Sequence, residues 1–168
     1  MGYDAYALIA DWPALVAARR EHEGDDLWWA VREELPFLTV RDFVGGWAFQ
    51  AAAFVYEQLR AALTPDLLAR VDPLLGALLA DGGPDDLAED AGRDLSGAVY
   101  AMRPERVTAL AATDLPWDHL RTASAGVRYI DPDHVRDFDT FRWVVDQQTA
   151  WLGEARDRGR GLAVVVSF

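Results

Sequence analysis

Apolar and polar residues recur along this chain with two different periods, and each period predicts a different element. Residues 47–63 carry apolar and small side chains at helical spacing, which predicts an amphipathic helix that can pack closely against a neighbour. Residues 162–168 instead form a continuous apolar run rich in valine, which is typical of a strand buried on both faces. The chain is therefore expected to contain both helices and strands.

Residue types that favour helix ends separate the apolar segments. Asp11, followed by Pro13, predicts the start of a helix that runs to about residue 20, and Thr64 followed by Pro65 predicts the start of another. Because proline lacks a backbone N–H and crowds the preceding turn, Pro73 is expected to bend or restart this second helix before residue 80.

Short segments rich in β-branched or aromatic residues predict strands at residues 3–9, 98–102, 127–130 and 162–168. Further helices are expected from residue 27 until Pro36 ends the helix, at 104–112, after a cap at Asp114, and between a turn at 131–133 and Gly159. Residues 81–96 are polar and contain glycine and proline, so they are expected to be mostly loop. We therefore expect an α+β fold: a predominantly helical single globular domain, residues 1–168, with a small mixed β-sheet of three or four strands.

The chain is strongly acidic, with 28 Asp and Glu against 16 basic residues, all of them arginine, and a formal net charge of -12. This charge argues against nucleic acid as a partner, because phosphate backbones bind clustered positive charge. The sequence has no cysteine, which excludes disulfides, thiolate nucleophiles and cysteine-bound zinc. It shows no basic leader and no apolar run of the roughly 20 residues that a membrane span requires. We expect a cytoplasmic protein with no membrane partner.

Residues 85–90, with the sequence DDLAED, resemble the paired carboxylates with which isoprenoid enzymes hold magnesium and a diphosphate. Carboxylates four residues apart on a helix can share a hard cation. The alternative is a solvated acidic loop or helix start. The preceding Gly-Gly-Pro and the lack of a second acidic motif favour this alternative.

Two histidines lie near aspartates and aromatic residues between positions 117 and 134. The candidate catalytic residues are His119, His134, Asp118, Asp131 and Tyr129. An imidazole oriented by a carboxylate is a common general base, and two histidines with a carboxylate can hold a transition metal. Their spacing matches no known metal or hydrolase signature, so we predict no metal site and no cofactor. The aspartates are equally expected to stabilise a turn or a helix start.

Seven tryptophans are an unusual feature of this composition. Tryptophan lines ligand pockets and protein interfaces as well as cores. Candidate ligand-binding residues are Trp117, Trp28, Trp29 and Trp143. The two adjacent tryptophans point about 100 degrees apart on a helix, so one of them is expected to reach a surface. The alternative is that all seven complete the core and its rim.

Two segments in the second half of the chain resemble a known family. Residues 100–107, YAMRPERV, predict a strand that enters a helix, and residues 151–166, WLGEARDRGRGLAVVV, predict a helix that ends in glycine before a closing strand. With the chain length of 168 residues, they resemble the YfbM-like family of uncharacterised bacterial proteins. The resemblance implies an α+β cytosolic domain, and it implies no reaction and no catalytic residues.

The sequence leaves several functions open. The first is a soluble acidic interaction domain, of immunity or regulatory type, that recognises a protein partner through its charge and aromatic residues. The alternative is a cofactor-independent enzyme that binds an apolar small molecule in an aromatic-lined pocket and uses a histidine and an aspartate as acid and base. A third hypothesis is a homo-oligomer in which surplus tryptophans bury an interface. Whether the chain is an enzyme stays open at this point.

Overall fold

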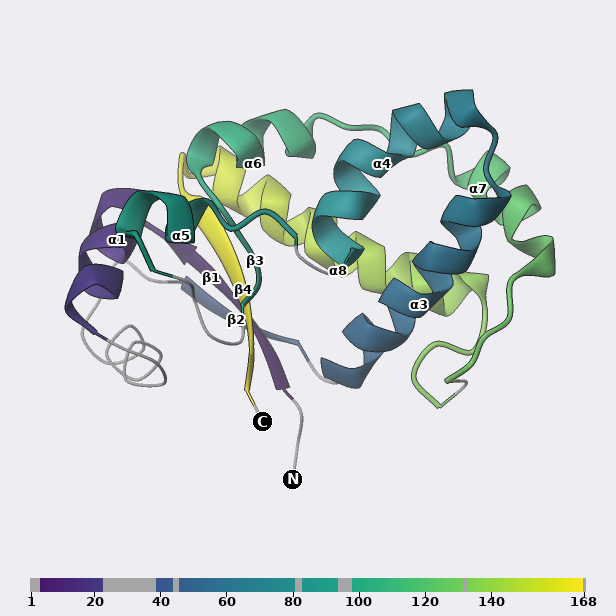
Figure 1. Cartoon of the computed structure of the whole chain (residues 1–168), viewed down its shortest axis with the longest axis horizontal. Coiled ribbons are helices and arrows are strands. Elements are labelled where there is room, and N and C mark those ends of the chain that lie inside the picture. The colour runs from purple at the N-terminus through teal and green to yellow at the C-terminus, as the bar shows by residue number, and fades with distance from the viewer. Residues whose placement is uncertain are drawn as a thin grey trace.

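The computed structural model describes residues 4–22, 39–43, 46–80, 83–93, 98–131 and 133–167. Four strands form one sheet in the order β2-β1-β4-β3 (Figure 1). They are β1 (Asp4–Ala10), β2 (Thr39–Phe43), β3 (Ala98–Met102) and β4 (Gly161–Ser167). The expected α+β class and the expected number of strands are confirmed.

All three pairs of neighbouring strands are antiparallel, so the expectation of a mixed sheet is wrong. A parallel pair needs a crossover that returns the chain to the end of the sheet from which it left. Here β3 and β4 are joined through several helices rather than one crossover helix, and β4 pairs with β1 from the other end of the chain. Helices between consecutive strands are therefore compatible with a sheet in which all neighbouring strands are antiparallel.

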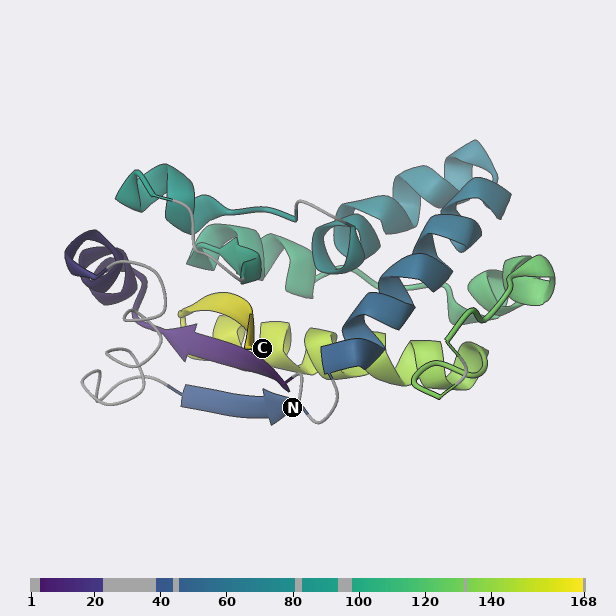
Figure 2. The same cartoon turned by 60° about the horizontal axis from the view of Figure 1, so that its bottom comes forward.

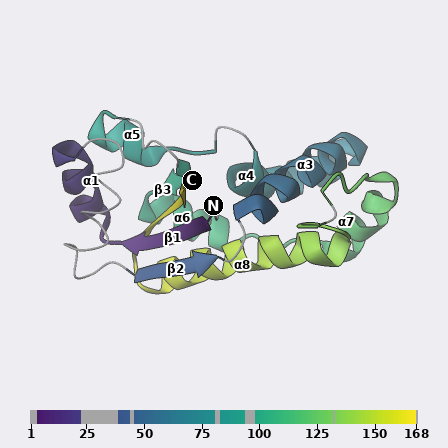
Figure 3. The same cartoon turned by 90° about the horizontal axis from the view of Figure 1, so that it is seen from below.

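Helices cover both faces of the sheet. One face carries α1 (Trp12–Glu21) and α5 (Asp86–Ala91). The other packs against α3 (Gly46–Ala62), α4 (Pro65–Leu79), α6 (Pro104–Ala111) and α8 (Phe138–Asp157). Figure 3 shows α8 running along the length of the molecule, from the sheet to α7 (Trp117–Ala123), which is followed by the short 3-10 helix η1 (Ser124–Gly126).

The central strand β4 buries side chains on both faces, as its apolar run predicts. Leu162 and Val164 join the larger hydrophobic cluster, which also contains residues of α3, α4 and α8. Ala163 and Val165 join the smaller cluster beneath α1 and α5. The alternation follows from the period of two along a strand. Figure 2 shows the helical layer above β1 and β2, with α8 behind them.

The predicted helix ends are confirmed at several positions. The side chain of Asp11 accepts a hydrogen bond from the backbone N–H of Ala14 at 3.2 Å, and Thr64 likewise caps α4 through Leu67. Gly159 has a φ of 61, the left-handed conformation that glycine adopts most easily, and the backbone leaves α8 there.

Pro73 lies inside α4, which continues to Leu79 without a restart. Buried apolar side chains on both sides of the proline, among them Val71 and Leu74, pack into the larger hydrophobic cluster. The burial of these side chains stabilises α4 by more than the missing backbone N–H of Pro73 destabilises it. The expectation of a bend or restart considered only the effect of the proline on the backbone.

Three expected elements differ from the structure. Residues 127–130 form no strand, and β2 takes that place at the edge of the sheet by pairing with β1. Residues 81–96 include the helix α5, whose first turn is capped by Asp85. Asp114 caps no helix, because α7 begins after Pro116 without a side-chain cap. The helix expected from residue 27 to Pro36 lies outside the described residues. Within the described ranges, no helix is both long and apolar enough to cross a membrane.

Candidate functional site

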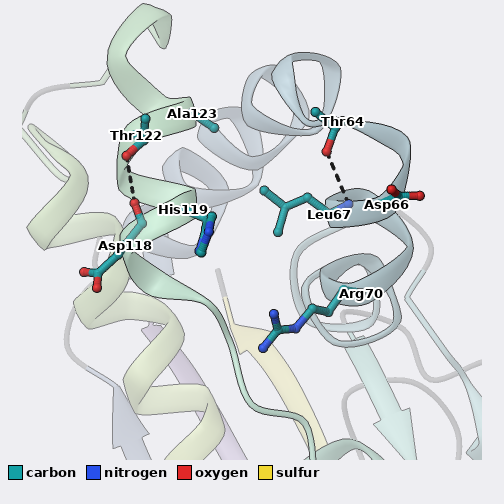
Figure 4. A pocket seen from close by; sticks show the side chains of 8 residues that line it. All are labelled: Thr64, Asp66, Leu67, Arg70, Asp118, His119, Thr122 and Ala123. Carbon is teal, nitrogen blue, oxygen red and sulfur yellow. Dashed lines mark hydrogen bonds between the residues drawn. The ribbon is translucent and has the colours of Figure 1, made fainter.

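A cavity of about 580 Å³ opens between the start of α4 and α7. We call it the α4–α7 cleft, and its lining residues are Thr64, Asp66, Leu67, Arg70, Asp118, His119, Thr122 and Ala123. Figure 4 shows Leu67 and Arg70 pointing from α4 toward the gap and His119 pointing into it from α7. Two of the candidate catalytic residues, Asp118 and His119, therefore lie at a concave surface.

Asp118 does not orient His119. The two carboxylate oxygens of Asp118 point away from the imidazole in Figure 4, and the described structure contains no hydrogen bond or ion pair between these side chains. The reason is helical geometry, since neighbouring residues on a helix point about 100 degrees apart. The acid–base pair predicted at this position is not formed.

The other histidine does have a carboxylate partner. Nδ1 of His134 lies 2.9 Å from Oδ1 of Asp131, and the two side chains are 36% and 37% exposed. The backbone N–H of His134 also donates to the carbonyl of Asp131, so the pair belongs to a tight turn. The imidazole lies 6.4 Å from the Trp47 ring, measured between centroids. The turn thus holds the imidazole against the start of α3, where solvent reaches it.

The segment that carries this turn is fastened along α3. Nε2 of Gln58 donates to the carbonyl of Arg128 at 2.8 Å, and Oε1 of Gln58 accepts from the backbone N–H of Arg128 at 2.9 Å. The segment is therefore held at one end by Gln58 and at the other by the contact between His134 and Trp47. Figures 2 and 3 show it as the thin green trace that passes beside α3 before α8 begins.

Three large apolar side chains are exposed along this contact: Trp47 at 46%, Phe54 at 47% and Ile130 at 69%. Trp47 and Phe54 are seven residues apart on α3, so they lie on the same side of the helix. Ile130 lies in the fastened segment, between the contacts at its two ends. We call these three side chains the aromatic surface.

Sequence reasoning missed the aromatic surface. Phe54 falls between Ala52 and Val55 of the buried helical face and is not part of its periodic pattern. A large aromatic residue outside the periodic apolar positions of a helix indicates an exposed apolar side chain, and this pattern could have revealed the surface. No local pattern placed Ile130 in a segment that contacts α3 at Gln58 and Trp47.

The two histidines belong to different parts of the molecule. His134 lies near Trp47 in the first turn of α3, whereas the α4–α7 cleft includes Thr64, which follows the end of α3. A helix of 17 residues spans about 25 Å. His119 and His134 therefore cannot hold one metal ion or act on one bond.

Tyr129 is half-buried. Burial raises the pKa of its phenol, an effect that a hydrogen bond with Ser124 partly opposes. In the described structure, no hydrogen bond or ion pair joins Tyr129 to either histidine. Its predicted catalytic role finds no geometric support.

The candidate tryptophans have different surroundings. The ring of Trp117 lies edge-on to that of Phe138 at 6.1 Å, and the guanidinium of Arg142 lies 5.0 Å from the Trp117 ring centre. Trp117 therefore belongs to the rim of the core. Trp143 is 47% exposed on α8, so the alternative in which all seven tryptophans complete the core is wrong. Trp28 and Trp29 lie outside the described residues.

The acidic segment at residues 85–90 is used within the fold. Asp86 is 1% exposed and forms an ion pair with Arg106, and Glu89 forms one with Arg103. The other two carboxylates cap α5 and accept the indole N–H of Trp12. Because these carboxylates already have internal partners, the magnesium and diphosphate interpretation is not supported.

Among the described residues, no group of three or more His, Asp and Glu side chains could hold a metal ion. The resemblance to the YfbM-like family stays a prediction. No protein-family model matches this chain, and comparisons with curated proteins and with solved structures found no match.

Proposed function

We propose that this protein binds another protein through the aromatic surface formed by Trp47, Phe54 and Ile130. The observation that supports the proposal is the exposure of these three large apolar side chains where α3 contacts the segment from Arg128 to His134. Gathered apolar side chains, unlike scattered ones, are typical of interaction sites. Aromatic anchors also supply a large share of the binding energy in protein interfaces.

The aromatic surface is held in place before any partner arrives. Trp47 and Phe54 stand on a helix of 17 residues, and Gln58 binds both backbone groups of Arg128 two residues before Ile130. A surface whose backbone is already ordered loses less conformational entropy on binding. This arrangement supports binding to a specific partner rather than nonspecific association.

The charge of the molecule indicates the chemistry of the partner. The formal net charge is -12. The exposed residues Glu57 and Asp133 each lie three positions along the chain from a residue of the aromatic surface. Acidic surfaces attract basic partners and increase their rate of association. We propose a protein partner with a basic surface around an apolar centre, as in regulatory or immunity-type pairs.

Affinity capture tests the proposal when it compares the native chain with Phe54→Asp. The native chain is expected to retain a basic protein, identified by mass spectrometry, more strongly at low salt than at high salt. The affinity for the purified partner, measured by calorimetry, is expected to fall by about tenfold or more in Phe54→Asp. Circular dichroism verifies that the variant is folded.

A matched control separates this effect from the added charge. Ala109 is exposed on α6, which Figure 1 places by the sheet and away from α3, so Ala109→Asp adds the same charge elsewhere. Ala109→Asp is expected to bind the partner like the native chain. Equal retention by Phe54→Asp and the native chain, or equal losses in both variants, would contradict the proposal.

A further inference from the structure

We infer that the α4–α7 cleft is a binding site for a small apolar carboxylate, whose charged group lies between Arg70 and His119. This site is separate from the aromatic surface, and it requires no protein partner. The inference rests on which of the lining groups are still available to a ligand.

Each of the two threonine hydroxyls in the cleft makes one hydrogen bond within its own helix. Oγ1 of Thr64 accepts the backbone N–H of Leu67 at 3.4 Å, and Oγ1 of Thr122 donates to the carbonyl of Asp118 at 3.0 Å. These two bonds are the dashed lines in Figure 4. The threonine side chains therefore add methyl groups to the cavity wall, and the Thr64 O–H remains a possible donor.

The two carboxylates of the lining point outward. In Figure 4 the side chain of Asp66 extends to the far side of α4 and that of Asp118 extends away from the gap, whereas Arg70 and His119 extend into it. A site that presents a guanidinium and an imidazole inward favours an anion. Guanidinium binds a carboxylate through two parallel N–H groups, and imidazole adds an N–H donor.

Arg70 differs from most of the other arginines in having no side-chain partner in the part of the chain that the structure describes. Arg60 pairs with Asp72, Arg121 with Asp139, and similar ion pairs occupy most of the others. Among the described residues, the guanidinium of Arg70 forms no hydrogen bond or ion pair. A ligand can therefore bind these donors without breaking a contact to any of the described residues.

The rest of the cleft sets the class of ligand. Leu67 and Ala123 give it apolar walls, and its volume of about 580 Å³ lies in the range of small-molecule sites. The formal net charge of -12 repels ligands with several negative charges. A single carboxylate on an aromatic or aliphatic body fits the apolar walls, the two donors and the charge together.

An NMR titration with sodium benzoate tests this inference. In a protein labelled with nitrogen-15, saturable shift changes are expected at the backbone amides of Thr64, of residues 66–70 and of residues 117–123. Benzyl alcohol has a similar apolar body without the charge, and it is expected to bind about tenfold more weakly or worse. Equal binding of the two compounds, or changes that do not saturate, would overturn the inference.

Two arginine variants test which guanidinium binds the carboxylate of benzoate. Arg70→Ala is expected to weaken benzoate binding by about tenfold, because the charged partner is lost. Arg128 is also exposed, and its guanidinium forms no hydrogen bond or ion pair among the described residues, so Arg128→Ala is the matched control. That variant is expected to bind benzoate like the native chain. If Arg70→Ala keeps the native amide spectrum and the native affinity, the site is not the one inferred here.

Discussion

The carboxylate of Asp86 accepts two hydrogen bonds from the guanidinium of Arg106, each 2.8 Å long, at a position where Asp86 is 1% exposed. The backbone N–H of Arg103 adds a third bond at 3.0 Å. The pair joins α5 on one face of the sheet to α6 on the other. A buried carboxylate is tolerated only when it is paired in this way.

Removing the carboxylate is expected to destabilise the fold strongly. Asp86→Ala removes the acceptor of three hydrogen bonds from Arg106 and Arg103, whose side chains are partly exposed, so we expect the free energy of unfolding to fall by about 1–3 kcal/mol in urea denaturation. The control is Asp139→Ala, because Asp139 forms an exposed ion pair with Arg121. That variant is expected to lose only about 0–1 kcal/mol. Similar losses in the two variants would show that burial of Asp86 contributes nothing.

The same contact predicts a dependence on acid. Burial of Asp86 opposes ionisation, but the bonds from Arg106 and Arg103 outweigh it and hold the pKa of this carboxyl below its ordinary value. A carboxyl with a lowered pKa in the folded state stabilises the fold above its unfolded pKa of about 3.9, and this stability is lost as the pH falls through the folded pKa.

The comparison that isolates this effect is the native chain against Asp86→Asn. The difference in their free energies of unfolding is expected to be largest near neutral pH and to shrink below about pH 4. Urea denaturation at several pH values measures it. A difference that stays constant down to acid pH would mean that the Asp86 carboxyl does not titrate with a lowered pKa.

A buried tyrosine predicts the behaviour at high pH. Tyr100 is 1% exposed and its hydroxyl donates to Oε1 of Gln148 at 3.2 Å. Burial raises the pKa of this phenol above its ordinary value. The unfolded chain therefore loses this proton first, so stability is present below about pH 10 and is lost as the pH rises further.

Tyr100→Phe is expected to reduce the alkaline slope of the free energy of unfolding by about 1.4 kcal/mol per pH unit above pH 10. Urea denaturation between neutral and alkaline pH measures this slope. At neutral pH the variant is expected to lose about 1–2 kcal/mol, since Gln148 loses its donor. An unchanged alkaline slope would contradict the assignment of a raised pKa to Tyr100.

The sequence predicted those features of the structure that depend on contacts between residues close together along the chain. Asp11 and Thr64 cap helices through residues three positions away, and Asp131 meets His134 at the same separation. Such contacts follow from backbone geometry within one turn and can be read from the sequence.

The rest of the fold and of the site depends on contacts between distant residues. Asp86 is buried because Arg106, 20 positions later, neutralises it, and Gln58 fastens Arg128 across 70 positions. Composition alone predicted that Asp86 belongs to a solvated acidic segment. It also made residues 127–130 an apolar strand rather than one side of an exposed surface. Neither pattern contains the distant partner that determines the outcome.

Two glycines predict opposite effects of the same substitution. A Cβ on Gly161 would lie 2.3 Å from Cε3 of Trp12 and 3.1 Å from the carbonyl of Met102. The indole of Trp12 is held by its bond to Asp90, so it cannot move without loss. We expect Gly161→Ala to lower the free energy of unfolding by about 1–3 kcal/mol.

Gly153 provides the matched control for this substitution. It lies inside α8, and a Cβ built on it meets nothing within 4 Å. Alanine favours the helix over glycine, so Gly153→Ala is expected to raise the free energy of unfolding by about 0.5–1 kcal/mol. Thermal or urea denaturation measures both variants. A stability change of the same sign in both would contradict the close packing of β4 on Trp12.

The last prediction concerns the bond pair that holds Ile130 in the aromatic surface. Gln58→Ala removes both hydrogen bonds to the backbone of Arg128, so the Arg128 amide is expected to exchange with solvent roughly tenfold faster in hydrogen-exchange measurements. Gln50→Ala is the control, because Gln50 is exposed on the same helix and has no bond to residues 127–134 in the described structure. If Gln58→Ala also weakens partner binding while Gln50→Ala does not, the ordered backbone around Ile130 contributes to recognition. If exchange at Arg128 is unchanged in Gln58→Ala, this segment is held by other contacts and the aromatic surface is not fastened in the way proposed.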